Sequence, residues 1–174
     1  MYINAGYRAP VVVPYDRVKA VQYAHRWALG RNPRYYNFDG FGGDCTNFAS
    51  QVIYAGSGVM NYKPVYGWYY INANKRSPSW TGVNFLYNFL VANTGVGPFA
   101  ERVDVKDVKP GDIVQLSFQG GNRYDHSPVI VVTGAVPSVD NILIAAHTYD
   151  RDMYPLTEYS WKEIRFIHIK GVRK

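Results

Sequence analysis

Hydrophobic residues recur at helical spacing in three segments of the first half of the chain. The spacing predicts helices from Asp16, a good N-cap residue, to near Gly30, from Cys45 to about Ala55, and over residues 82–92. Their apolar faces comprise Val18, Val21, Ala24 and Ala28 in the first, Phe48, Ala49, Val52 and Ile53 in the second, and Val83, Leu86, Phe89 and Leu90 in the third.

The second half of the chain changes to short β-branched runs separated by turns. We expect four antiparallel strands, at residues 113–116, 129–133, 141–147 and 165–170. Pro128 lacks an N–H donor, which predicts a sheet edge or a bulge at the second of these strands. Because helices come first and strands later, the order predicts an α+β fold, with N-terminal helices packed on a small antiparallel sheet in one domain, 1–174.

The only cysteine, Cys45, is predicted to open the second helix, with Asp44 as its N-cap. A thiol at a helix N-terminus lies among free backbone N–H groups and at the positive end of the macrodipole, and both favour the reactive thiolate. We therefore expect a nucleophile whose pKa lies below its usual range. The alternative is a buried cysteine that packs as a small apolar residue.

A cysteine nucleophile needs a base and a third group that orients the base. His126 precedes the second predicted strand and His147 ends the third, so antiparallel pairing would place them side by side at one edge of the sheet. Alternation puts His147 on the face that packs against the helices. The topology thus predicts Cys45, His126 and His147 together, whereas His25 is expected to be a surface or structural histidine.

Residues around the thiol are the candidates for contacting substrate. The N–H of Cys45 is the expected first donor to an oxyanion, and Tyr36 is one candidate for the second. We also predict substrate contacts from Asp44, and from Trp68 and Trp80, which lie in an aromatic stretch over residues 57–80 of a chain with 16 tyrosines. Amphipathic aromatic rings suit the wall of a groove, but a place in the core is the alternative for them.

Charge and composition limit the classes of binding partner that we expect. The net charge of +6 could attract nucleic acid, anionic polymers or lipid surfaces, but the cations are scattered and no nucleic-acid-binding motif accompanies them, so we expect no nucleic-acid partner. No apolar run is long enough for membrane insertion. No cofactor or metal is expected: a zinc site of Cys45 with two histidines is conceivable, but the paired ligand motifs typical of zinc sites are missing.

The segments Gly42-Gly43-Asp44-Cys45-Thr46-Asn47-Phe48-Ala49-Ser50-Gln51, Asn32-Pro33-Arg34-Tyr35, Trp68-Tyr69-Tyr70 and Ala146-His147-Thr148 carry a family resemblance. The chain resembles the bacterial "putative amidase domain" family, within the papain-like superfamily of cysteine peptidases that includes NlpC-type and CHAP domains. This resemblance implies a papain-like fold, with Cys45 as nucleophile, His126 as general base and His147 as the third, polar residue. It also implies amide or peptide substrates, with cell-wall peptidoglycan as a candidate.

The sequence therefore predicts a thiol-dependent amidohydrolase or peptidase. One alternative is a non-catalytic module that binds wall polymer or glycan, and another is an acyltransferase in which an amine replaces water. The resemblance suggests a secreted or cell-surface protein, although residues 1–8 show no signal-peptide pattern.

Overall fold

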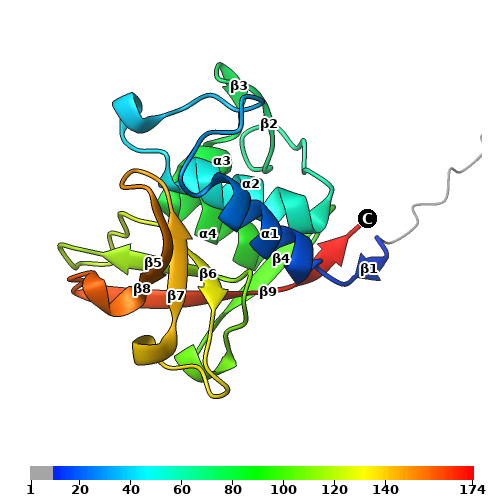
Figure 1. The fold of residues 1–174 in the computed structure, drawn as a ribbon. Helices are drawn as coiled ribbons and strands as arrows, with labels where there is room; N and C mark the ends of the chain where they lie inside the picture. Colours follow the sequence, from blue (N-terminus) through cyan, green and yellow to red (C-terminus); the bar gives the residue numbers. More distant parts are fainter. Residues whose placement is uncertain (1–9) are drawn as a thin grey trace, which may run out of the picture.

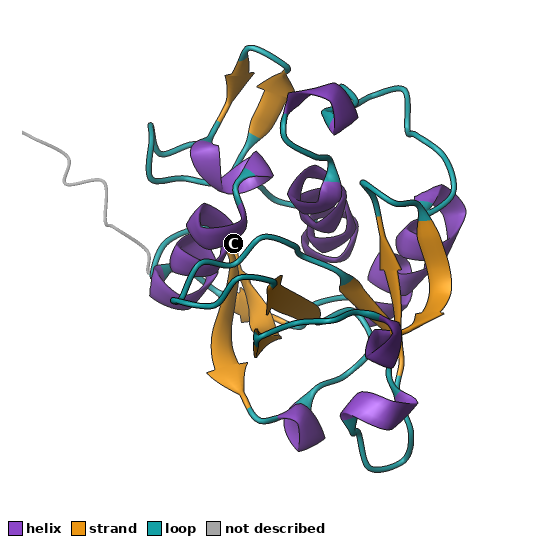
Figure 2. Ribbon diagram, turned by 90° about the vertical axis from the view of Figure 1, so that its left-hand side faces the viewer, coloured by secondary structure: helices purple, strands orange, loops and turns teal. Residues whose placement is uncertain are grey.

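The structure is a computed structural model that describes residues 10–174. The expectation about a signal peptide falls on residues 1–8, which lie outside the described part. Helices cover one face of a curled antiparallel sheet (Figures 1 and 2), so the α+β class is confirmed. The helices are α1 (Arg17–Trp27), α2 (Cys45–Ser57), α3 (Pro78–Thr81) and α4 (Val83–Ala92).

The main sheet has seven strands in the order β1-β9-β5-β6-β7-β8, with β4 also paired to β9. Their bounds are β1 Val12–Val13, β4 Gly97–Val103, β5 Ile113–Ser117, β6 Val129–Val132, β7 Leu143–Ala146, β8 Arg151–Pro155 and β9 Glu163–Arg173. A separate hairpin joins β2 (Tyr70–Asn72) and β3 (Lys75–Arg76). All four predicted strands are present as β5, β6, β7 and β9, whereas β1, β4, β8 and the hairpin were not predicted.

All three predicted helices form, but one buried face differs from the prediction. In α1, Ala20, Ala24 and Ala28 are fully buried, whereas Val18 is 67% exposed. The small alanines at i, i+4 and i+8 let α1 approach the core closely. The helix is therefore rotated about its axis relative to the prediction, so that the alanine face is buried and Val18 is not. Asp16 caps α1 as predicted, because its carboxylate accepts the N–H of Lys19 at 3.0 Å.

The α2 helix is the central element of the helical layer. Its predicted stripe of Phe48, Ala49, Val52 and Ile53 is completely buried. The helix continues past its predicted end near Ala55, through Gly56, and is capped by Gly58 in a left-handed conformation with φ of 69°. A glycine is needed at position 56 because Tyr15 packs against the helix there. A Cβ at this position would lie 2.3 Å from the Tyr15 ring.

Two hydrophobic clusters hold these layers together. The first joins the helices to one face of the sheet and includes Ala24, Phe48, Trp80 and Ala145. The second lies on the opposite, concave face and includes Leu116, Ile130, Ile144 and Leu156. The expected sheet edge at Pro128 is wrong, since β6 lies between β5 and β7, and the pairs Leu116↔His126 and Ile113↔Val129 keep one register past Pro128. The strand does have a register shift against β7, but further along, between Ile130 and Val132. The Pro128 carbonyl still accepts the N–H of Val114 at 3.0 Å.

Candidate active site

A glycine turn sets the position of Cys45 at the start of α2. Gly42 and Gly43 have φ angles of 96° and 106°, which side chains disfavour. A Cβ on Gly43 would also lie 2.9 Å from the hydroxyl of Thr148, and that hydroxyl accepts the N–H of Asp44 at 3.0 Å. The turn thus brings the start of α2 into contact with Thr148, in the loop that follows β7.

The Cys45 thiol lies in a nearly closed polar setting. It is 7% exposed, and its sulphur lies 3.7 Å from the Thr46 hydroxyl. The main-chain N–H groups of Ser127 and Thr46 also donate to the sulphur, and they lower the thiol pKa. Burial outweighs them, so the pKa of Cys45 is raised above its usual range. The expectation of a lowered pKa is therefore wrong for the resting site.

His126 lies beside Cys45. It immediately precedes Ser127, whose N–H reaches the thiol, and it pairs with Leu116 across the sheet. Burial alone lowers the pKa of His126 to about 4, because no carboxylate interacts with the ring. The ring Nε2 lies 3.2 Å from the Tyr159 hydroxyl. Within residues 10–174 no hydrogen bond joins the imidazole to the thiol, so the resting site holds a neutral thiol next to a neutral base.

His147 does not orient His126. Its Nδ1 lies 2.6 Å from Asp44 Oδ2 and its Nε2 lies 2.7 Å from the Trp27 carbonyl oxygen, so both ring nitrogens have other partners. The ring also stacks on Phe48 with centroids 4.0 Å apart. Its predicted helix-facing position is correct. The β6–β7 pair Val129↔Ala145, continued outward, places Ser127 opposite His147, so His126 points to the other face of the sheet.

Asp44 is a buried structural hub and not a substrate contact. It is 1% exposed, and its Oδ1 accepts the N–H of Phe38 at 2.9 Å and the Asn47 side-chain amide at 2.8 Å. Its Oδ2 holds His147, with Arg31 Nε 3.5 Å away. Although Asp44 occupies the N-cap position of α2, its side chain makes no capping bond there. The Asp44 side chain therefore leaves the N–H of Cys45, at the first position of α2, available to another acceptor.

Trp68 and Trp80 are likewise core residues. Both are fully buried; the indole N–H of Trp68 donates to Ser50 and that of Trp80 to Asn47. The prediction that they contact substrate is therefore wrong. Tyr36 differs, because it is 44% exposed and packs beside Phe38 in the loop before Cys45. Its role toward substrate stays a prediction.

Tyr159 is the site residue that the sequence did not reveal. It follows a short 3₁₀ turn, η4 (Leu156–Glu158), and its hydroxyl meets His126. Burial is the main cause that raises the pKa of Tyr159 to about 12, and the charge of Arg151 opposes it. Tyr159 is one of 16 tyrosines and lies after a strand that was not predicted, so no spacing singled it out.

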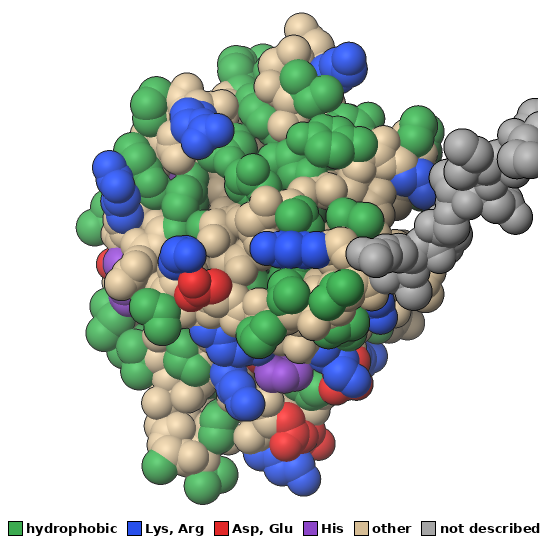
Figure 3. All heavy atoms as spheres, turned by 90° about the vertical axis from the view of Figure 1, so that its right-hand side faces the viewer, with side chains coloured by type: hydrophobic (Ala, Val, Ile, Leu, Met, Phe, Trp, Pro, Cys, Tyr) green, Lys and Arg blue, Asp and Glu red, His purple; other side chains and the backbone are tan. Residues whose placement is uncertain are grey.

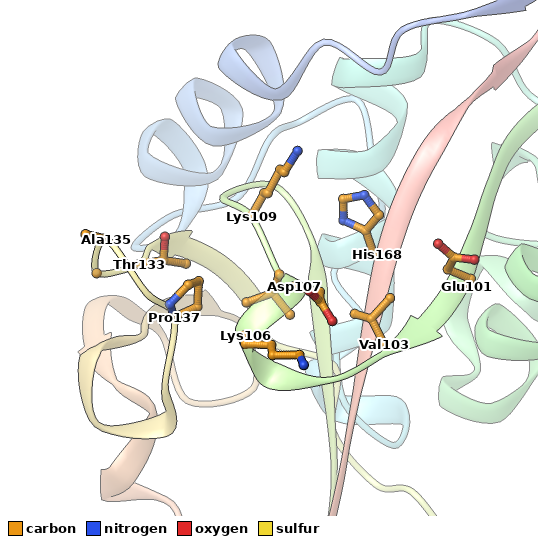
Figure 4. Close-up of a pocket in the computed structure, with 11 residues that line it drawn as sticks. Glu101, Val103, Lys106, Asp107, Lys109, Thr133, Ala135, Pro137 and His168 are labelled. Carbon is orange, nitrogen blue, oxygen red and sulfur yellow. The ribbon is translucent and has the colours of Figure 1, made fainter.

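The other histidines lie in different settings. His25 is a surface residue, as predicted, with Nδ1 2.8 Å from Asp152. His168 Nδ1 lies 2.7 Å from the buried Asp112. The His168 ring borders a hollow of about 630 Å³, which Lys106 and Lys109 also line (Figure 4). Among residues 10–174, no cluster of three or more His, Cys, Asp or Glu side chains could hold a metal ion.

The surface is basic overall. The face in Figure 3 shows Lys and Arg side chains spread among fewer Asp and Glu side chains, in keeping with the net charge of +6. In the described part of the chain, no helix has both the length and the apolar character needed to cross a membrane.

Comparison with known proteins places the chain in a family. The model of the family described as "Putative amidase domain" matches residues 14–169. The chain belongs to this family. It is also similar to "Uncharacterized protein YhbB" of Bacillus subtilis (strain 168), with 36% identity over 143 residues that cover 80% of this chain and 43% of that protein. The chain thus spans less than half the length of this relative. No solved structure matches the chain.

Membership of this family suggests a class of activity. The family description indicates amidohydrolase activity, and relatives occur in bacteria. The family match includes Cys45, His126 and Tyr159, which the fold gathers at the start of α2. A thiol, an imidazole and an uncapped helix-start N–H are groups that acyl transfer uses.

Proposed function

We propose that this protein is a thiol-dependent amidohydrolase or peptidase, with Cys45 as nucleophile and His126 as general base. The observation that carries the proposal is the placement of a lone cysteine at the first residue of a buried helix, next to the strand that presents His126. Membership of an amidase family supports the same chemistry.

The reaction begins with proton transfer from the Cys45 thiol to the His126 imidazole as the sulphur attacks the amide carbonyl. A tetrahedral intermediate forms, and the resulting imidazolium returns the proton to the leaving amine as the C–N bond breaks. Water then attacks the thioester while His126 takes its proton, and the C–S bond breaks to release the acid and restore the thiol. Because both groups are neutral at rest, proton transfer accompanies attack and does not precede substrate binding.

The start of α2 supplies the oxyanion site in this scheme. The Asp44 carboxylate is directed to Phe38, Asn47 and His147, so it does not block the first-turn N–H groups of the helix. These amides and the positive end of the helix macrodipole stabilise negative charge on the carbonyl oxygen. Removing one such donor typically slows an enzyme about 10²- to 10³-fold.

The substrate class that we propose is a peptide or other secondary amide, and bacterial wall peptide is its first candidate because the chain resembles wall peptidases. The test incubates wild type, Cys45→Ala and His126→Gln with purified peptidoglycan and with a peptide-amide library, and analyses released fragments by mass spectrometry. We expect Cys45→Ala to lose at least about 10³-fold and His126→Gln at least about 10²-fold in rate. Adding amine acceptors to the wild type separates hydrolysis from acyl transfer. Full turnover by Cys45→Ala would exclude the proposal.

A further inference from the structure

The imidazole of His126 needs a partner that holds it in one tautomer. In a cysteine–histidine pair, one ring nitrogen takes the thiol proton, so the other must carry its own proton and donate it elsewhere. The predicted partner, His147, is engaged by Asp44 and the Trp27 carbonyl. The question is therefore which group near His126 accepts this second bond.

The carboxylates of Asp125, Asp150 and Asp152 are committed to other groups. The neighbouring residue Asp125 accepts the N–H of Phe118 at 3.2 Å and lies 3.5 Å from Arg123. Asp152 pairs with His25, and Asp150 pairs with Arg31. Across residues 10–174, the Tyr159 hydroxyl is the sole hydrogen-bond partner of the His126 ring.

Tyr159 is held firmly enough to orient another side chain. Its main-chain N–H donates to the carbonyl of Leu156, which is fully buried in the concave core and donates its own N–H to Ile142. The Tyr159 ring packs edge-on against Tyr154 with centroids 5.6 Å apart, and the His126 and Tyr159 centroids are 5.3 Å apart. Phe118 borders both rings, at 6.3 Å from His126 and 6.5 Å from Tyr159. Such packing fixes the tyrosine rotamer.

The geometry points to Tyr159 as the positioning residue of the site: its hydroxyl oxygen accepts the Nε2–H of His126 and thereby keeps the lone pair on Nδ1 for the Cys45 proton. This inference rests on the proposed function of Cys45 and His126. The one hydrogen bond of the ring within residues 10–174 uses Nε2, which leaves Nδ1 available for that transfer.

A tyrosine performs this task differently from a carboxylate. Because its pKa is raised to about 12, Tyr159 stays a neutral hydroxyl at every pH at which the site would work. It accepts a hydrogen bond from the imidazolium without neutralising the positive charge. The imidazolium formed during attack is therefore a strong acid, well suited to return its proton to the leaving amine. A carboxylate in the same place would hold the proton more tightly.

The test combines NMR with kinetics. Two-bond ¹H–¹⁵N correlation spectra of the wild-type protein near pH 7, with His126 assigned from the His126→Gln spectrum, report its tautomer. We expect the Nε2–H form in wild type and a mixture of tautomers in Tyr159→Phe. In parallel, kcat of Tyr159→Phe for any amide found to be cleaved should fall about tenfold, the equivalent of one net hydrogen bond, with KM nearly unchanged.

Tyr154→Phe is the matched control, since it removes a hydroxyl from the neighbouring ring, which makes no hydrogen bond to His126. It should keep both the wild-type tautomer and the wild-type kcat. A wild-type Nδ1–H tautomer, or an unchanged kcat in Tyr159→Phe, would overturn the inference. The NMR result needs no turnover, so the two failures can be told apart. Retained activity in Cys45→Ala would overturn the proposed function and, with it, the role of Tyr159, whereas a wild-type Nδ1–H tautomer would overturn only the inference about Tyr159.

Discussion

At the scale of single residues, burial dominates the chemistry of the candidate site. It raises the pKa of Cys45 and lowers that of His126, so each group is neutral at physiological pH. The placement of Cys45 at a helix start was evident from the sequence. The direction of its pKa was not, because burial of the thiol depends on tertiary packing, such as the approach of Ser127 from the segment before β6.

The raised pKa of Cys45 predicts slow alkylation of the folded protein at neutral pH. The rate with iodoacetamide should rise toward alkaline pH, with a midpoint above about 8.5, the value of a free cysteine. The measurement is the pseudo-first-order rate of mass increase between pH 6 and pH 10, with urea-unfolded protein as the reference. A midpoint below that of the unfolded chain would show that the thiolate is stabilised at rest.

The lowered pKa of His126 predicts a pH dependence of stability. Between its folded pKa of about 4 and the ordinary value of 6.5, the unfolded state binds more protons, so the free energy of unfolding rises with pH in this window. The full contribution is present above pH 6.5 and is lost as the pH falls to about 4. It amounts to about 3 kcal/mol at most.

Urea unfolding of wild type and His126→Gln at several pH values between 4 and 7 measures this contribution. The difference in stability between the two proteins should grow with pH across this range and level off above pH 6.5. A difference that stays constant would mean that the His126 pKa is not lowered by folding.

At the scale of elements, the two helices that open with an aspartate use it differently. Asp16 caps α1 through Lys19 N–H, whereas Asp44 joins α2 to Phe38, Asn47 and His147. Sequence pattern identifies both as N-cap residues, since the preference is local. The buried contacts of Asp44 depend on a strand end about a hundred residues away, which no local pattern reveals.

This difference predicts unequal costs of truncation. Asp16→Ala should lower the free energy of unfolding by about 1 kcal/mol, the usual value of a cap. Asp44→Ala should cost about 3 to 5 kcal/mol, because it leaves a buried His147 and other donors without their partner. Urea titrations of both variants provide the comparison. Equal losses in the free energy of unfolding would mean that the buried contacts of Asp44 stabilise the protein no more than a helix cap does.

Gly56 provides a second test of how α2 packs. Alanine normally stabilises a helix interior by about 1 kcal/mol over glycine. Here a Cβ would meet the Tyr15 ring at 2.3 Å and the Asp16 carbonyl at 2.8 Å, so Gly56→Ala should destabilise the protein by about 1 to 3 kcal/mol. Gly30→Ala, with nothing within 4 Å, is the control and should leave stability nearly unchanged. A gain in stability from Gly56→Ala would contradict the close approach of Tyr15.

At the scale of the whole molecule, periodicity predicted the α+β class, three helices and four central strands. It missed β4 and β8, where burial is mixed and turn residues interrupt the runs. The register between β6 and β7 determines which histidine lies beside Cys45. His126 and His147 do lie at one end of neighbouring strands, but a displacement of one residue turns them to opposite faces. Tyr159, and not His147, is the hydrogen-bond partner of His126, because tertiary packing brings its hydroxyl to the ring.

The most direct test of the account is to find the acyl group on the enzyme. Wild type should be mixed with a cleaved peptide amide, or with the corresponding activated ester, quenched in acid within the first turnover, and mapped by tandem mass spectrometry. We predict an acyl thioester on Cys45 that hydroxylamine removes and that is absent from Cys45→Ala. Turnover with the acyl group on another residue, or undiminished in Cys45→Ala, would contradict the assignment of Cys45 as the nucleophile.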